Sequence, residues 1–287
     1  MLGWCGDATG GLTNVQDDED LSTRPSSAFV AREDGNYQAT ELTRGPWDRE
    51  HQHAGPPSAL VAQAIARAAA PLGFTHMARL TVSLWRPIPI AELKVVVDTA
   101  YAGRNVGHFA AQLFASGKEV ARFTALVQRE SDVGILPDLP GHPPPLAPRP
   151  VNESPPARFP FSNRWVGYPD LMEIRVAEGA YFAGPCAVWF RLRHPLVAGE
   201  EPTPIERVAV AADSGNGISA VLDFRRYLFV NNDLTINLFR RPQGEWICID
   251  ARTLVSGGSG LAEARIFDTG GLIGRSTQSL LIRLRDH

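Results

Sequence analysis

Hydrophobic and polar residues alternate along much of the chain, which is the pattern of strands with one buried face. In the first half this pattern marks segments 78–85, 92–102, 106–115 and 119–129. Short turn signals separate these segments, and short connections join antiparallel rather than parallel neighbours. The first half therefore predicts an antiparallel meander. A strand-like stretch over 29–44, broken at Asp34-Gly35, predicts a hairpin before it.

One segment of the first half has helical rather than alternating character. Residues 58–70 are rich in strong helix formers, follow Pro56 and Pro57, and end at Pro71. The segment is apolar on most sides, so we expect neighbouring elements to enclose it. A sheet curled around the helix satisfies that requirement, which predicts an α+β layer.

The second half has the same order of elements. Its predicted strands cover 172–177, 187–193, 234–239, 246–254, 261–267 and 277–284. A short apolar helix is expected over 218–222, directly after a glycine-containing stretch.

Two matched segments indicate that the halves are copies. Residues 80–86 (LTVSLWR) align without gaps to 234–240 (LTINLFR), and 117–122 (GKEVAR) align to 270–275 (GGLIGR). Both matches have nearly the same offset and occupy equivalent places in the order of elements. We interpret the chain as a tandem duplication of one helix-plus-sheet unit.

Composition divides the chain further. Residues 1–27 contain an acidic cluster and no periodicity, and are predicted to be a flexible leader. Residues 28–133 form the predicted N-terminal unit, 134–160 a proline-rich linker and 161–287 a C-terminal unit.

Charge and cysteine content exclude several classes of protein. The net charge is −3, so the chain has no broad basic surface for nucleic acid. The 3 cysteines are far apart and fit neither a disulfide framework nor a zinc site, which favours a reducing cytoplasm. No apolar run approaches the roughly 20 residues of a membrane-spanning helix, and no signal peptide is indicated.

A repeated helix wrapped by a long antiparallel sheet resembles the double hotdog architecture, and the motifs resemble the acyl-CoA thioesterase II (TesB-like) family. These motifs are HAGPPSAL at 53–60, LTVSLWRP at 80–87, ADS at 212–214, LTINLFRRP at 234–242, GEW at 244–246 and STQ at 276–278. The resemblance spans roughly residues 28 to 285, nearly the whole ordered chain.

The resemblance implies hydrolysis of fatty acyl-CoA to free acid and CoA by an Asp, a Gln and a Thr or Ser of the second unit. Asp213 falls on the family aspartate and Gln278 on the glutamine. The third position falls within Asn231-Asn232, so asparagine replaces the usual hydroxyl. An asparagine amide can orient a water by hydrogen bonding. Thr235 lies close by and ranks below the asparagines.

The residues around Asp213 suggest their own chemistry. If a helix starts after Asp213, the amides of Gly215, Asn216 and Gly217 are free to stabilise a thioester oxyanion. Asp213 and Gln278 would then orient the attacking water across a water-sized gap. Gly55, at the first helix, joins the expected substrate-contacting positions. The alternative is that Asp213 only caps the helix.

Other chemistries fit less well. His51 and His53 lack a third ligand in sequence, so a structural role in their loop is favoured over a metal pair. Hotdog dehydratases use an Asp and a His at the helix, and the expected second helix has no histidine. Neither a metal nor an organic cofactor is required for thioester hydrolysis.

Three functional hypotheses follow. The first is a cytoplasmic acyl-CoA thioesterase. The second is a hotdog protein that binds acyl-CoA or another acyl ligand without turnover, suggested by the asparagines. The third is a structural or oligomer-forming domain, since double hotdog protomers often assemble into homo-oligomers.

Overall fold

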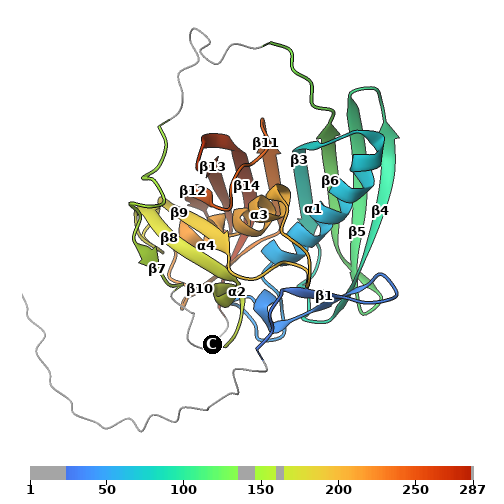
Figure 1. Cartoon of the computed structure of the whole chain (residues 1–287). Helices are drawn as coiled ribbons and strands as arrows, with labels where there is room; N and C mark the ends of the chain where they lie inside the picture. The colour runs from blue at the N-terminus through green and yellow to red at the C-terminus, as the bar shows by residue number, and fades with distance from the viewer. Residues whose placement is uncertain (1–23, 135–145, 160–164, 286–287) are drawn as a thin grey trace, which may run out of the picture.

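The structure is a computed structural model that describes residues 24–134, 146–159 and 165–285. Most of the predicted leader and the centre of the predicted linker lie outside the described residues. Within the described ranges, one antiparallel sheet of 14 strands carries the helices on one face (Figure 1). The strand order is β1-β2-β4-β5-β6-β3-β11-β14-β13-β12-β9-β8-β7, and β10 also pairs with β14.

The meander strands of the first half are confirmed within two residues at each end. The strands of this half are β1 (Phe29–Ala31), β2 (Tyr37–Ala39), β3 (His76–Leu84), β4 (Glu92–Ala102), β5 (Val106–Ala115) and β6 (Lys118–Gln128). The expected hairpin is formed by β1 and β2, and Gly35 adopts a positive φ of 81° in its turn. A 3₁₀ turn, η2 (Glu41–Thr43), replaces the end of the predicted second strand.

The second half repeats the arrangement. Its strands are β7 (Pro156–Ala157), β8 (Met172–Glu178), β9 (Cys186–Leu192), β10 (Tyr227–Asn231), β11 (Asp233–Leu238), β12 (Ile247–Ser256), β13 (Ser259–Asp268) and β14 (Gly271–Leu284). The short strands β7 and β10 have no counterpart among the predicted segments.

The helices differ more from prediction. They are α1 (Gly55–Ala69), η3 (Ala70–Leu72), α2 (Tyr168–Leu171), α3 (Pro204–Ala212) and α4 (Gly215–Ile218). The predicted helix over 218–222 is wrong, because α4 ends at Ile218 and the longer helix of this half, α3, precedes Asp213. The sequence did contain a start signal, since Pro204 occupies the first turn and the Glu206 carboxylate accepts a hydrogen bond from the Thr203 amide at 2.6 Å.

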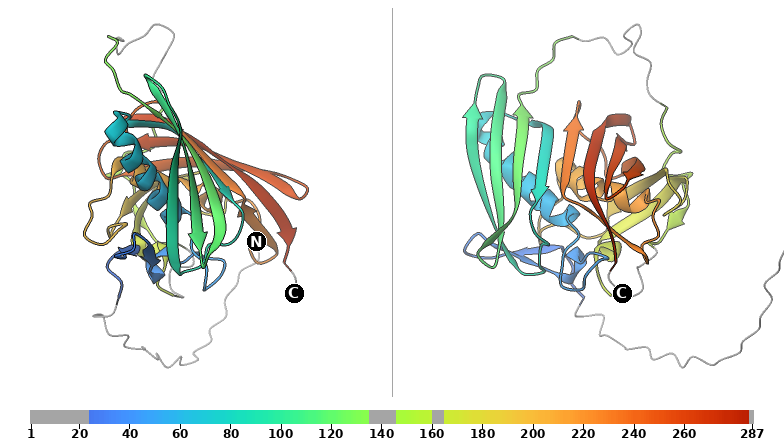
Figure 2. Two further views of the ribbon diagram at one scale, coloured as in Figure 1. Left: turned by 90° about the vertical axis from the view of Figure 1, so that its right-hand side faces the viewer. Right: turned by 180° about the vertical axis from the view of Figure 1, so that it is seen from behind.

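The duplication has a direct structural counterpart at the centre of the sheet. The matched segments lie on β3 and β11, which pair antiparallel with Thr81 opposite Thr235. These two threonines are also aligned with each other in the repeat, at an offset of 235 − 81 = 154 residues. A residue that pairs with its own repeat equivalent marks a pseudo-twofold axis. The two units therefore join strand to strand into one continuous sheet, seen from behind in Figure 2.

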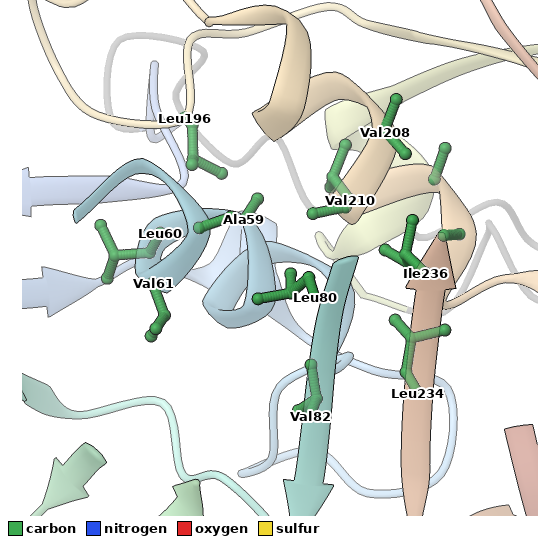
Figure 3. Close-up of a cluster of buried hydrophobic side chains, with 14 of the residues drawn as sticks. Ala59, Leu60, Val61, Leu80, Val82, Leu196, Val208, Val210, Leu234 and Ile236 are labelled. Carbon is green, nitrogen blue, oxygen red and sulfur yellow. The ribbon is translucent and has the colours of Figure 1, made fainter. Parts of the chain in front are cut away.

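A continuous core lies over this seam between the units. It is drawn in Figure 3 with Leu80 and Val82 of β3, Leu234 and Ile236 of β11, Ala59, Leu60 and Val61 of α1, Val208 and Val210 of α3, and Leu196. Every one of these side chains is almost fully buried. Strand alternation explains why the threonines at the axis point to the opposite face.

The helices α1 and α3 pack against each other in opposite directions. Gly55 begins α1, and a Cβ added there would lie 2.5 Å from the carbonyl oxygen of Val210, near the end of α3. At the other end of the pair, the Gln63 amide of α1 donates to the Glu206 carboxylate at 2.9 Å. Close contact at Gly55 places the start of α1 beside the end of α3, where Asp213 follows.

A glycine in β14 allows the close approach of β11. A Cβ added at Gly274 would lie 2.0 Å from the carbonyl oxygen of Asn237, a distance that requires the strands to separate. We expect Gly274→Ala to lower the free energy of unfolding by about 1–3 kcal/mol, measured by urea titration. The control is Gly258→Ala, whose added Cβ meets only Ile282 O at 3.5 Å. Equal stability of the two variants would contradict the prediction.

Candidate active site

Asp213 lies between α3 and α4. It is the C-cap of α3, and Ser214 precedes the first residue of α4 as its N-cap. The alternative that Asp213 is itself a helix N-cap is therefore wrong. Its side chain is only 4% exposed, so its carboxylate needs partners inside the protein.

Three side chains from three different elements surround this carboxylate. Asn231 Nδ2 donates to Oδ1 at 2.8 Å, and Gln278 Nε2 donates to the same oxygen at 3.2 Å. His53 Nδ1 lies 3.1 Å from Oδ2. Both carboxylate oxygens are thus engaged, which fixes the group in orientation.

Gln278 reaches Asp213 from the inner face of β14. Its Nε2 also donates to the Asp213 carbonyl oxygen at 3.1 Å, and its Oε1 accepts from the Asn216 amide at 2.9 Å. The predicted meeting of Asp213 and Gln278 is present, but as a direct contact. The expected water-sized gap between the two groups is wrong.

The structure distinguishes the two asparagines. Asn231 ends β10 and turns its amide toward Asp213, whereas Asn232 is exposed and contributes backbone hydrogen bonds to Ser279 and Leu84. Asn231 and Asn232 are consecutive, and consecutive side chains of an extended segment point to opposite faces. Asn232 is therefore placed outside the cluster.

The other two predicted positions differ in their distance from the carboxylate cluster. Thr235 contacts Thr81 on the outer face of the seam, at 3.4 Å between hydroxyl oxygens. Its neighbours Leu234 and Ile236 occupy the inner face, so strand alternation places Thr235 on the face opposite the cluster. Gly55 is buried against Val210, which permits close helix packing, and its amide nitrogen lies 3.1 Å from His53 Nδ1.

The glycine stretch after Asp213 only partly matches the expectation. The Asn216 amide is already bonded to Gln278, so it is not free for an oxyanion. Gly215 is buried, and a Cβ there would lie 3.1 Å from Gln278 Oε1. Gly217 is exposed and faces the neighbouring cavity, which makes its backbone the remaining candidate donor of the three.

His53 is the residue of this cluster that the sequence interpretation missed. It precedes α1 in the first unit, and the packing of α1 against α3 brings it to Asp213 of the second unit. Its ring stacks on Tyr168 of α2, with centroids 3.9 Å apart and planes 3° from parallel. The argument against dehydration from a missing helix histidine is therefore wrong, because the histidine comes from the other unit.

The protonation of His53 follows from its surroundings. Burial lowers the pKa of His53 below its usual value, against the opposing effect of Asp213, so the ring is neutral near pH 7. Nδ1 also lies 3.1 Å from the Gly55 amide nitrogen, and one nitrogen cannot donate and accept at once. The charged Asp213 carboxylate favours the Nδ1–H tautomer, which leaves Nε2 as a proton acceptor.

A cavity adjoins His53. Its interior volume is about 130 Å³, and Ser214, Gly217 and His53 form its polar wall next to Asp213. Much of the remaining wall consists of aromatic side chains from both units. Asp213 and Gln278 are not among the lining residues, so the cluster meets the cavity through His53.

Models of known protein families cover most of the chain. The acyl-CoA thioesterase N-terminal domain matches residues 43–128, and the acyl-CoA thioesterase C-terminal domain matches residues 143–282. The chain belongs to the acyl-CoA thioesterase family. This confirms the family resemblance that the sequence motifs indicated. A search of functionally curated proteins found no significant match.

Solved structures of low sequence identity share the fold of this family member. A candidate thioesterase II of Thermobifida fusca has a TM-score of 0.70 at 17% identity, covering 90% of this chain and 96% of that one. A candidate thioesterase of Novosphingobium aromaticivorans has a TM-score of 0.66 at 20% identity, and the match covers 88% of this chain and 98% of that one. Acyl-CoA thioesterase II TesB2 of Mycobacterium marinum has a TM-score of 0.59 at 18% identity, and the match covers 90% of this chain and 95% of that one. These likenesses confirm the double hotdog fold class.

Two further observations concern partners. Among the described helices, none has the length and apolarity needed to cross a bilayer. The Arg240 guanidinium forms a pair of hydrogen bonds with the buried Asp268 carboxylate, at 2.6 and 2.7 Å. That arginine is therefore committed to the fold of the second unit.

Proposed function

We propose that this chain hydrolyses fatty acyl-CoA thioesters, with His53 and Asp213 activating water at the edge of the aromatic cavity. The observation that carries the proposal is the 3.1 Å contact between His53 Nδ1 and the buried Asp213 carboxylate. A neutral imidazole held by a carboxylate is suited to take a proton from water near pH 7. The family membership supports thioester cleavage as the reaction.

Each member of the cluster has a role in this proposal. His53 Nε2 accepts the proton of the attacking water and returns it to the departing CoA thiolate. Asp213 holds the Nδ1–H tautomer and stabilises the imidazolium. Gln278 and Asn231 are positioning residues, because both donate to Asp213 Oδ1 and so leave Oδ2 for His53. The Gly217 backbone supplies the proposed donor for the oxyanion.

Asn231 in place of a hydroxyl residue is compatible with this chemistry. Its amide donates to the Asp213 carboxylate at 2.8 Å, which is the same type of hydrogen bond that a Thr or Ser hydroxyl provides. The non-catalytic acyl-CoA binder remains the second hypothesis. Release of free CoA thiol from an acyl-CoA series separates the two, because a binder produces none above the rate of the Asp213→Asn variant.

A histidine–aspartate pair can also add water to the double bond of an enoyl-CoA, so this second reaction must be tested. A 2-enoyl-CoA probe distinguishes the chemistries in one experiment. A thioesterase releases thiol and leaves the double bond intact, whereas a hydratase consumes the enoyl absorbance without releasing thiol. Loss of enoyl absorbance without thiol would overturn the proposed hydrolysis.

Replacing His53 tests its assigned role. We expect His53→Gln to lower kcat/KM by about 10²-fold or more, the usual size of a general-base contribution. Because the pKa of His53 is lowered, the wild-type rate should persist below about pH 6.5 and fall as acid protonates the ring at still lower pH. The variant should lose this acid limb.

The matched control is His51→Gln. His51 belongs to the same loop but contacts the surface residue Asp48, at 3.2 Å. It should retain both the rate and the acid limb. An unchanged pH profile in His53→Gln would show that Asp213 acts on water without the histidine.

A further inference from the structure

Aromatic rings form a large part of the wall of the cavity beside His53. Seven of its 16 lining residues are Trp, Tyr or Phe. Trp47 comes from the loop before α1, Tyr168 from α2, Tyr181 and Phe182 from the β8–β9 loop, and Phe229 from β10. Rings from both units thus surround one space.

These rings already contact one another in the geometries that aromatic pairs prefer. Trp47 meets Phe229 edge-on, with centroids 5.3 Å apart and planes at 84°. The ring centroid of Phe159 lies 5.7 Å from that of Tyr168 and 6.1 Å from that of Tyr181. An aromatic ligand gains stacked or edge contacts from such walls in addition to burial, whereas an aliphatic chain gains burial alone.

The cavity offers no free positive charge among its described lining residues. The Arg44 guanidinium donates to the carbonyl oxygens of Arg49 and Val166 and to the Glu41 carboxylate, at 2.6–3.0 Å. Its charge is therefore used within the protein. The ligand group that enters this cavity should be uncharged.

One polar group of the wall, the buried hydroxyl of Tyr181, has no hydrogen-bond partner among the described residues. Burial raises the pKa of Tyr181, so this hydroxyl stays protonated and can donate a hydrogen bond. A buried hydroxyl without a hydrogen bond destabilises a protein unless a ligand or a water molecule forms that hydrogen bond. By contrast, the Tyr168 hydroxyl is bonded to Val210 and Ser214, at 3.0 and 2.8 Å.

The backbone of the same loop is also held in an unfavourable conformation. Phe182 has a φ of 58°, in the left-handed region that favours glycine. Its ring packs on the ring of Phe224, with centroids 5.7 Å apart. A bulky ring kept at such a position points to a functional constraint on the cavity wall.

We infer that the cavity binds an aromatic acyl group, and that the Tyr181 hydroxyl hydrogen-bonds a polar substituent on its ring. This inference rests on the thioester hydrolysis proposed for the same site, and it replaces unbranched fatty acyl chains by aryl-bearing acyl groups as the preferred substrate class. The preferred substrates are aryl-bearing acyl thioesters with a hydroxyl or similar group, rather than straight-chain acyl thioesters of equal carbon number.

The test compares three thioesters by CoA thiol release: octanoyl-CoA, phenylacetyl-CoA and 4-hydroxyphenylacetyl-CoA. All three have the same number of acyl carbons, but the octanoyl chain has the larger hydrocarbon surface, so burial alone would favour octanoyl-CoA. We expect kcat/KM for phenylacetyl-CoA to exceed that for octanoyl-CoA by about tenfold, from ring contacts. The hydroxyl should add roughly another threefold to tenfold. Equal or faster hydrolysis of octanoyl-CoA would overturn the inference.

Two variants assign the effects to residues. Phe159→Leu keeps an apolar side chain and should reduce the preference for phenylacetyl-CoA over octanoyl-CoA. Tyr181→Phe should remove the preference for the hydroxylated over the unsubstituted ring, and should raise Tm because it deletes an unpaired buried hydroxyl. The control is Tyr101→Phe on β4, whose side chain is exposed and distant in the sheet order. A hydroxyl preference unchanged in Tyr181→Phe would refute the assigned contact.

Binding of the product acids separates the inference from the proposed function. Calorimetry with 4-hydroxyphenylacetate, phenylacetate and octanoate requires no turnover. Tighter binding of the aromatic acids without thiol release from any thioester would support the aromatic site and refute hydrolysis. Thiol release without a preference for aromatic groups in either assay would support hydrolysis and refute the aromatic site.

Discussion

The Asp213→Asn variant is expected to fold normally and to lose about 10³-fold or more of its kcat/KM for acyl-CoA. Asn231 and Gln278 both donate to Oδ1, so the new amide should place its carbonyl oxygen there. Its NH₂ group then faces His53 Nδ1. That nitrogen must become an acceptor, which moves the ring proton to Nε2 and removes the base.

The Gly55 amide makes this loss more complete, because it lies 3.1 Å from the same Nδ1 and also favours the acceptor tautomer. Initial rates of thiol release over a range of substrate concentrations give kcat/KM, and a thermal scan checks the fold. Asp98→Asn, an exposed change on β4, should retain wild-type rate. Wild-type thiol release in Asp213→Asn would refute the assigned mechanism.

The second large effect concerns stability at the seam. Ile236 is 1% exposed and pairs in register with Leu80 of the other unit. We expect Ile236→Ala to reduce the free energy of unfolding by about 2–5 kcal/mol, as for other large-to-small changes in packed cores. Urea titration followed by fluorescence and circular dichroism measures this loss.

Asn237→Ala is the matched control, since it is the next residue on β11 and points to the exposed face. It should change stability by less than about 0.5 kcal/mol. Because the seam joins both units, the double variant Leu80→Ala with Ile236→Ala should be less destabilised than the sum of its parts. Strict additivity would contradict this prediction, because it would show that Leu80 and Ile236 are not energetically coupled across the seam.

The strands were predictable because each has one face in the core. Along β5, for example, alternate positions such as Phe109 and Leu113 are buried, so the sequence pattern maps directly onto the sheet. The repeat was also readable, since β3 and β11 keep similar sequences on both sides of the axis. The order of neighbours at the centre then follows from the pseudo-twofold relation.

The helices and the site were less predictable. α3 was missed although Thr203-Pro204 and Glu206 form a start signal, because its short apolar sequence resembles a buried strand. Asp213 and Gln278 meet as expected. His53 could not be assigned from spacing, since 160 residues (213 − 53) separate it from Asp213 and only the packing of α1 on α3 joins them.

The opposed ends of the helix pair have become chemically different. One end presents a histidine beside a carboxylate, and the other a glutamine amide bonded to Glu206, whose pKa is raised by burial. Two identical subunits could not make this distinction, because every substitution would occur at both ends. Fusion of the copies into one polypeptide allows one end to specialise in chemistry while the other is free to evolve for stability.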